Sequence, residues 1–259
     1  MIGVHKPGER EGGGTDRPCR PEWVAVDGPA GAGKSTLARA LARALGFRYI
    51  DTGATYRAAA LAALRAGLCP EREQDWPAIV QTVERSRIEL EVDPTDPGPT
   101  RVRLNGVDVS RLVRSQEVSQ AASSVARIPG VRACLTRWQR QLAEQGPCVM
   151  DGRDIGTVVL PEACVKFYVT ASLQERARRR AQELRGMGEQ ADAAGSAEDL
   201  AAQLQRRDEQ DRMRPTAPLA QAPDAVEIDT TGLEPDEVLQ QALAVCRRRL
   251  GREPSRSTG

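Results

Sequence analysis

Short apolar runs alternate along the chain with longer segments whose apolar positions have helical spacing. The apolar runs cover residues 23–27, 48–50, 148–150, 165–169 and 225–228. The clearest helical pattern, over residues 34–45, is followed by Gly46, and glycine commonly ends helices. Strands that alternate with helices are typical of a parallel sheet with crossover connections, so we predict an α/β fold.

One region departs from this alternation. Residues 88–92 alternate between apolar and polar with period two, and the runs 102–104 and 107–109 flank Asn105-Gly106. Asn-Gly between two such runs is a strong hairpin signal, so a small antiparallel β insert is expected here. Helical patterns follow over residues 116–126 and 131–145, separated by Pro129-Gly130.

The two ends of the chain differ in composition from the rest. Residues 1–22 are polar and rich in glycine and proline, and residues 251–259 are similar, so both are predicted to be disordered tails. Residues 23–250 are expected to form one domain with appendages. No apolar run approaches the roughly 20 residues of a membrane helix, and the N-terminus is too polar for a signal peptide. We therefore expect a cytoplasmic protein without a membrane partner.

Charge and residue usage narrow the possible chemistry. Lys and Arg total 37 against 36 Asp and Glu, so no overall field attracts nucleic acid or anionic lipid, and we expect no nucleic-acid partner. His5 is the only histidine, which nearly excludes mechanisms that need a histidine base or ligand. The 6 cysteines include no C-x-x-C pair and are expected to be ordinary reduced thiols.

A glycine-rich segment between the first predicted strand and helix carries the strongest motif. It fits G-x-x-x-x-G-K-[ST], a loop whose backbone N–H groups cradle polyphosphate, through Gly28, Pro29, Ala30, Gly31, Ala32, Gly33, Lys34 and Ser35. We call residues 28–35 the phosphate loop. The Lys34 ammonium would follow charge on the β- and γ-phosphates, and the Ser35 hydroxyl would bind Mg²⁺ directly. We assign ATP binding to this loop and to Thr36, which follows it.

Several classes of phosphate-loop protein fit poorly. A GTPase switch needs N-K-x-D, which the sequence lacks, and a motor or transport ATPase normally needs a longer chain. Scattered arginines instead suit two phosphate chains that face each other, which favours a small-molecule kinase. A nucleotide-binding regulatory module without an acceptor substrate remains the alternative from another class.

Further segments make the resemblance specific. Residues 27–35, 51–57 (DTGATYR), 151–157 (DGRDIGT) and 207–214 (RDEQDRMR) together resemble bacterial cytidylate kinases, and the similarity extends from Trp23 to about Leu250. It implies the three-part nucleoside-monophosphate kinase fold: a core built on the phosphate loop and parallel sheet, an NMP-binding part and a short lid. The NMP-binding part would span about residues 53–127 and carry the antiparallel insert. The lid would span about residues 178–200.

The resemblance also implies an activity. It implies direct in-line transfer of the γ-phosphoryl group of ATP to CMP or dCMP, giving ADP and CDP or dCDP, in pyrimidine nucleotide metabolism. The substrates would be the only partners of a monomer. A kinase for UMP or another nucleoside monophosphate on the same scaffold is the runner-up.

Residue roles follow from the same resemblance. Thr52, Arg57 and Arg153 would hold the acceptor phosphate, and Tyr56 would pack against the nucleoside. Lys34, Arg57 and Arg153 would be the catalytic residues. Cytosine presents an amine donor beside an unprotonated ring nitrogen. The resemblance implies that Ser123 and Asp154 accept hydrogen bonds from the base and that Arg132 and Arg214 make further contacts with it. Arg207 and Asp211 would bind the ribose hydroxyls.

The lid and the metal site complete the expected constellation. Arg176 and Arg180 resemble the ATP-facing arginines of the family, beside a flexible stretch that contains Gly186, Gly188, Ala193, Ala194 and Gly195. Asp151 ends a predicted strand and is expected to contact Mg²⁺ indirectly, next to the direct ligand Ser35.

Overall fold

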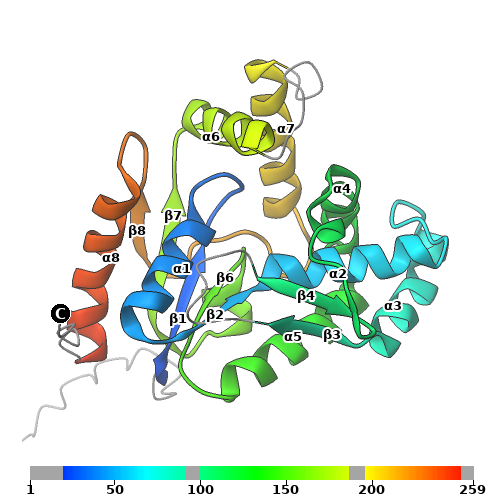
Figure 1. The fold of residues 1–259 in the computed structure, drawn as a ribbon, viewed down its shortest axis with the longest axis horizontal. Coiled ribbons are helices and arrows are strands. Elements are labelled where there is room, and N and C mark those ends of the chain that lie inside the picture. Colours follow the sequence, from blue (N-terminus) through cyan, green and yellow to red (C-terminus); the bar gives the residue numbers. More distant parts are fainter. Residues whose placement is uncertain (1–19, 92–99, 187–195, 252–259) are drawn as a thin grey trace, which may run out of the picture.

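The computed structural model describes residues 20–91, 100–186 and 196–251. Its core is one parallel sheet of five strands, and Figure 1 shows this sheet at the centre of the molecule. The strand order is β2 (Arg48–Asp51), β6 (Cys148–Asp151), β1 (Arg20–Asp27), β7 (Ala163–Thr170) and β8 (Val226–Asp229). The predicted α/β fold with a parallel sheet is confirmed.

Helices cover both faces of this sheet. On one face, α1 (Lys34–Leu45) and α8 (Pro235–Leu250) bury Val24 and Val26 of the central strand. On the other face, Trp23 and Ala25 pack with α5 (Pro129–Glu144) and the helical turn η3 (Ile155–Val159). Because the strands are parallel, the carboxyl ends of β1, β2 and β6 meet at one edge, where open α/β sheets bind ligands.

The antiparallel insert is present as a second sheet. It consists of β3 (Ile88–Glu91), β4 (Arg101–Leu104) and β5 (Val107–Asp108), paired in that order. Asn105 and Gly106 between β4 and β5 have φ values of 53° and 81°, which a two-residue hairpin turn of this kind requires. Val92, which the sequence pattern places in the first of these strands, lies outside the described residues.

Helices pack beside this insert to form a second hydrophobic core. They are α2 (Thr52–Arg65), α3 (Trp76–Arg85) and α4 (Gln116–Val125), with the short turns η1 (Glu73–Asp75) and η2 (Leu112–Arg114). The alanine-rich face of α2 is fully buried against α3, α4 and the insert, so this part of the molecule has its own core.

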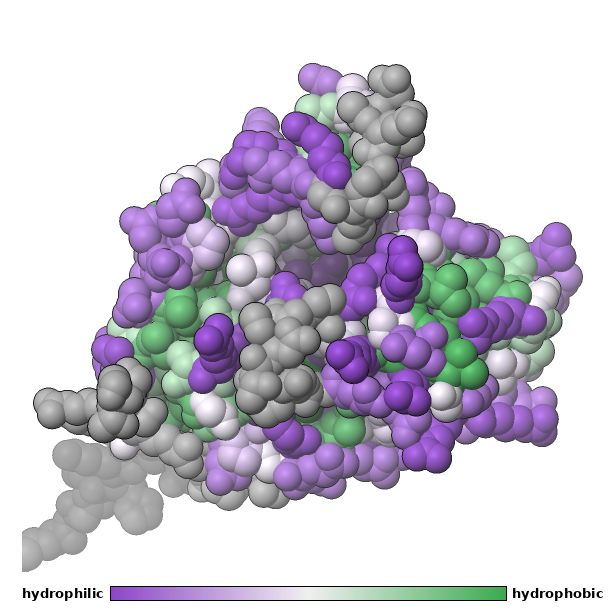
Figure 2. All heavy atoms as spheres, in the orientation of Figure 1, coloured by the Kyte–Doolittle hydropathy of each residue, from purple (hydrophilic) through white to green (hydrophobic). Residues whose placement is uncertain are grey.

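Two helices stand together above the carboxyl edge of the sheet (Figure 1). These are α6 (Leu173–Gly186) and α7 (Ala197–Arg212), joined through Leu184, Leu200 and Leu204. They flank the predicted lid stretch, of which Gly186 ends α6 and Gly188, Ala193, Ala194 and Gly195 lie outside the described residues. In the space-filling view, hydrophilic residues surround a hollow below these helices (Figure 2).

Three local features differ from expectation. β1 begins at Arg20, which pairs with Ala163, so residues 20–22 belong to the sheet and not to a tail, because backbone pairing outweighs their polar composition. The two predicted helices are present as α4 and α5, but the break between them lies at residues 126–128. Pro129 begins α5, since the first turn of a helix does not need the N–H that proline lacks. Cys164 is disulfide-bonded, although reduced thiols were expected.

The rest of the predicted tails, the other cysteines and the membrane prediction can be stated briefly. Residues 1–19 and 252–259 lie outside the described part of the chain. Cys69, Cys134, Cys148 and Cys246 are free, as expected. Among the described helices, none has the length and apolar character needed to cross a bilayer.

Candidate functional site

The phosphate loop connects β1 to α1 in a conformation that only glycine can adopt at its ends. Gly28 has a φ of +145°, and a Cβ there would lie 1.9 Å from the carbonyl oxygen of Val169. Gly33 has a φ of +87° and caps α1 without any side-chain hydrogen bond to the helix. The first N–H groups of α1 therefore have no side-chain cap, and uncapped N–H groups at a helix N-terminus are suited to bind an anion.

Lys34 lies in the first turn of α1 and folds back over this loop. Its Nζ donates to the carbonyl oxygen of Pro29 at 2.6 Å, and the residue is only 6% exposed. Burial, with Arg153 and Arg207 nearby, holds the pKa of Lys34 well below its usual value. An added negative charge would stabilise its ammonium form, which is what a bound polyphosphate supplies.

Positive charge accumulates across the cleft between the loop and α2. Burial, and after it the nearby cations Arg153 and Arg57, lower the pKa of Arg207 to about 10. Within the described residues, Arg207 makes no hydrogen bond or ion pair. Lys34, Arg57, Arg153 and Arg207 thus converge from α1, α2, the segment after β6 and α7, and the cluster calls for strongly anionic ligands.

The expected metal residues are in direct contact. Ser35 Oγ donates to Asp151 Oδ2 at 2.6 Å, and the Tyr49 hydroxyl donates to Asp151 Oδ1 at 2.9 Å. Asp151 is buried at the end of β6, and a hydroxyl beside a carboxylate is a donor set that suits Mg²⁺. These residues fit the metal that the phosphate loop implies, because Mg²⁺ is commonly held by few protein ligands and takes the rest from phosphate oxygens and water.

The start of α2 places two predicted acceptor residues beside this centre. Asp51 caps the helix by accepting from Ala54 N at 2.8 Å, and its other oxygen accepts from Arg57 at 2.9 Å. Thr52 is buried and donates to the carbonyl oxygen of Asp151 at 2.6 Å. Asp51, to which the sequence assigned no role, therefore orients Arg57 toward the cation cluster.

The residues expected to bind the base form a buried group. Arg132 donates to Asp154 in an ion pair whose side chains are 4% and 7% exposed. The guanidinium carbon of Arg132 lies 5.5 Å from the centre of the Tyr56 ring. Arg214 Nη2 is buried close by and has no hydrogen-bond partner in the described chain. This buried group therefore contains both a hydrogen-bond acceptor, the Asp154 carboxylate, and donors, the guanidinium groups of Arg132 and Arg214, that suit an aromatic base.

Ser123 is less closely tied to that group. Its hydroxyl bonds the carbonyl oxygen of Ser119 on its own helix at 3.5 Å, and no hydrogen bond joins it to Asp154 or Arg132 among the described residues. It lies on α4.

The residues expected to hold the ribose are linked to those expected to hold the phosphate groups. Arg153 donates to Asp211 Oδ2 at 2.8 Å and to the carbonyl oxygen of Gly28 at 3.0 Å. Although burial opposes ionisation, Arg153 and Arg214 hold the pKa of Asp211 below its usual value. Asp211 therefore remains a charged acceptor suited to hydroxyl groups.

Arg176 and Arg180 occupy different environments. Arg176 is 8% exposed and donates to Ala30 O at 3.1 Å and to Asp208, so it lies behind the phosphate loop and holds it. Arg180 is partly exposed, pairs with Glu183 at 2.7 Å and adds to the field at Arg207. Sequence reasoning missed Asp208, although it lies next to Arg207 in the RDEQDRMR segment.

Asp27 was also missed as a member of the site. Its two carboxylate oxygens accept from the N–H groups of Ile155 and Gly156 at 2.8 and 2.7 Å, directly after Arg153 and Asp154. An acidic residue that ends the strand before the loop was the signal that could have found it.

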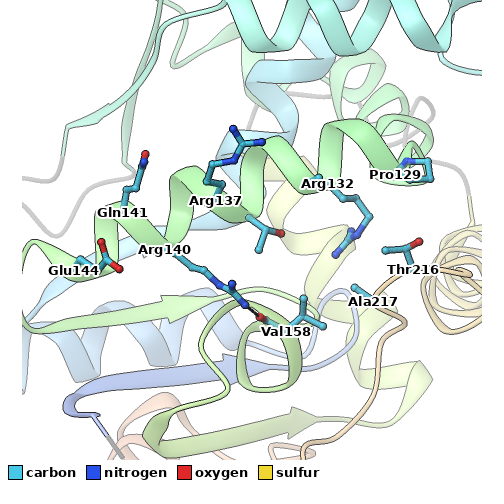
Figure 3. Close-up of a pocket in the computed structure, with 11 residues that line it drawn as sticks. Pro129, Arg132, Arg137, Arg140, Gln141, Glu144, Val158, Thr216 and Ala217 are labelled. Carbon is cyan, nitrogen blue, oxygen red and sulfur yellow. Dashed lines mark hydrogen bonds between the residues drawn. The ribbon is translucent and has the colours of Figure 1, made fainter. Parts of the chain in front are cut away.

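A separate pocket of about 610 Å³ runs along α5 (Figure 3). Arg132 is the one predicted site residue in its lining. Arg140 crosses its floor and donates to the carbonyl oxygens of Val158 and Val159 at 2.6 and 2.9 Å. The pocket thus adjoins the base-binding group through Arg132 without containing the rest of it.

Comparison with known proteins gives a consistent result. A sequence profile of the cytidylate kinase family matches residues 24–248. The chain is 49% identical over 225 residues to a cytidylate kinase of Symbiobacterium thermophilum, covering 87% of this chain and 96% of the relative. It is 48% identical over 227 residues to one of Solibacter usitatus, covering 88% and 93%. It is 43% identical over 226 residues to one of Geobacter sulfurreducens, covering 87% and 93%.

Proposed function

The chain belongs to the cytidylate kinase family, and on that premise we propose that it transfers the γ-phosphoryl group of ATP to CMP and dCMP. The observation that carries the proposal is the convergence of Lys34, Arg57, Arg153 and Arg207 on one cleft. A cleft with this surplus of positive charge can hold two phosphate chains whose mutual repulsion otherwise opposes transfer.

The proposed reaction is a direct in-line displacement. An oxygen of the acceptor phosphate attacks the γ-phosphorus of ATP, the bond from that phosphorus to the bridging oxygen of ADP breaks, and no covalent enzyme intermediate forms. The attacking oxygen is already anionic, so the enzyme needs no general base. Lys34 neutralises charge on the transferred group, while Arg57 and Arg153 hold the acceptor in line.

Ser35 and Asp151 would hold Mg²⁺, Ser35 directly and Asp151 through water. The ion, when bound, neutralises phosphate charge and orients the polyphosphate. Thr36 and the loop backbone complete the ATP site in this proposal, with Arg180 facing it from α6. Arg176 supports the site through its hydrogen bond to Ala30 O.

Base selection is assigned to Asp154, Arg132, Ser123 and Arg214, with Tyr56 packed against the nucleoside. Asp154 would accept from the cytosine amine, and Arg132 would donate to the ring nitrogen. Arg207 and Asp211 would hold the ribose. UMP lacks the amine donor, so we expect it to be a poorer substrate than CMP; a UMP kinase is the alternative on this scaffold.

The remaining assignments extend the same proposal. We assign an NMP-binding part to about residues 53–127 and a lid to about residues 178–200. We further propose a monomer that acts in the cytoplasm in pyrimidine nucleotide metabolism, without nucleic-acid or membrane partners. The nearly balanced charge of +1 supports the absence of such partners.

One assay tests the proposal. Release of ADP from ATP is measured with CMP, dCMP, UMP, AMP or no acceptor, and the highest kcat/KM is expected with CMP or dCMP. Turnover that is absent or independent of any acceptor favours a regulatory nucleotide-binding module, and a preference for UMP contradicts the base assignments. A folded Lys34→Ala enzyme should lose about two orders of magnitude in kcat or more; near-normal turnover would exclude the assigned role of Lys34.

A further inference from the structure

Both carboxylate oxygens of Asp151 are held by hydroxyl groups from different elements. Ser35 Oγ, from α1, donates to Oδ2 at 2.6 Å, and the Tyr49 hydroxyl, from β2, donates to Oδ1 at 2.9 Å. The orientation of the carboxylate is therefore set from two sides. Ser35 belongs to the phosphate loop, whereas nothing in the motif or in the assigned roles involves Tyr49.

The sheet places Tyr49 where it can reach Asp151. β2 pairs with β6 in parallel, and Tyr49 aligns with Val149 two residues before Asp51 aligns with Asp151. Since side chains alternate along a strand, Tyr49 and Asp51 share one face of β2. Tyr49 is 6% exposed and its ring belongs to the hydrophobic core beneath α1. Packing in the core therefore holds the Tyr49 ring in place, and this sets the position of its hydroxyl group.

Several charged and polar groups act on the Asp151 carboxylate, and Tyr49 is one of them. Burial and the facing carboxylate of Asp51 raise the pKa of Asp151, while hydrogen bonds from Ser35 and Tyr49 and the charge of Lys34 lower it. Burial, with Asp151 and Asp51, also raises the pKa of Tyr49 well above its usual value, so its hydroxyl keeps its proton. Tyr49 acts as a permanent donor to a carboxylate that faces a like charge.

We propose that Tyr49 is a positioning residue for the magnesium site, because its hydroxyl orients Asp151 to accept the hydrogen bond from Ser35 Oγ and so leaves the lone pairs of the Ser35 oxygen free for the metal. This inference rests on the proposed use of Mg²⁺ with ATP. Partners that orient metal ligands in this way commonly change metal affinity when removed.

The test removes one oxygen atom. ATP affinity of wild-type protein and of Tyr49→Phe is measured by calorimetry without acceptor, once with Mg²⁺ and once with excess EDTA. We expect the gain in affinity due to Mg²⁺ to fall about tenfold in Tyr49→Phe, and the affinity in EDTA to stay unchanged. An unchanged gain would overturn the proposal, and so would an equal loss in Mg²⁺ and in EDTA.

Two further variants separate positioning from stability. Tyr168→Phe, a matched change on β7, should leave the gain due to Mg²⁺ at the wild-type value. Adding Tyr49→Phe to Asp151→Asn should cause little further loss of the Mg²⁺-dependent gain in ATP affinity, because the hydroxyl acts through that carboxylate. If the two losses are additive, or if Tyr49→Phe lowers the Tm and leaves the gain due to Mg²⁺ intact, Tyr49 has a structural role only. Binding is measured without CMP, so a failure of the CMP kinase assignment would be visible only in the turnover assay.

Discussion

Arg176 and Asp208 form a buried ion pair behind the phosphate loop, with one residue from each of the two helices that flank the predicted lid. Asp208 Oδ1 accepts from Ala30 N at 3.2 Å, and Arg176 donates to Ala30 O at 3.1 Å. One peptide group on each side of Ala30 is thereby tied to α6 and α7. The position of these helices and the shape of the loop are mechanically connected.

Replacing Asp208 by Asn should weaken both the fold and ATP binding. Arg176 would remain buried without its counter-ion, and removing one partner of a buried pair costs about 3–5 kcal/mol. We expect this loss in urea unfolding, together with a raised KM for ATP. Glu209→Gln, an exposed acidic neighbour, is the control. A stability within about 0.5 kcal/mol of wild type, as for an ordinary surface change, would contradict the role of the pair.

Asp154→Asn should reduce selectivity for cytosine. The amide offers a donor where the base amine needs an acceptor, and Arg132 loses its buried partner. We expect the ratio of kcat/KM for CMP to that for UMP to fall at least about tenfold, measured in competition assays. Glu144→Gln, on the exposed side of α5 beside the neighbouring pocket, should keep the ratio. Equal losses with both substrates would show that Asp154 only supports the fold.

Gly28→Ala should damage the phosphate loop. The added Cβ would lie 1.9 Å from the backbone oxygen of Val169, so the loop or β7 must shift. We expect at least about a tenfold loss of ATP affinity, because the first amide groups of α1 would no longer be aligned. Gly146, the site of the control variant Gly146→Ala, has a comparable positive φ of +136° but nothing within 4 Å of an added Cβ. This variant should cost about 1–2 kcal/mol of stability and leave ATP affinity unchanged; equal behaviour of the two variants would refute the steric argument.

Asp27 should make stability depend on pH. Burial raises its pKa from 3.8 to about 7, against the hydrogen bonds from Gly156 and Ile155. The folded protein therefore binds this proton more tightly than the unfolded chain. The stabilisation of the folded state that comes from this raised pKa is fully present below about pH 4 and is lost as the pH rises through about 7.

Comparison with Asp27→Asn isolates this effect. The unfolding free energies of both proteins are measured in urea from about pH 4 to about pH 8. We expect the stability of wild type relative to Asp27→Asn to decrease across this interval by an amount on the order of a few kcal/mol. A difference that stays constant with pH would mean that Asp27 is already ionised throughout.

Features that depend on local backbone chemistry were predictable from the amino-acid sequence. The glycines of the phosphate loop, the Asn105-Gly106 turn and the Gly46 helix end were predictable because each needs a residue type at one position, whatever surrounds it. The alternation of apolar runs likewise predicted the parallel sheet. The resemblance added Arg132, Asp154 and Arg214, and the structure brings these together.

Which side chains those residues contact became apparent from the folded structure alone. Ala30 and Asp208 are 178 residues apart in the chain, and Tyr49 and Asp151 are 102 apart, so no local pattern records either contact. The same holds for the hydrogen bond that Arg176 donates to Ala30 O, which joins residues 146 apart in the chain. These partners depend on how strands and helices pack, and packing is set by the burial of the whole chain.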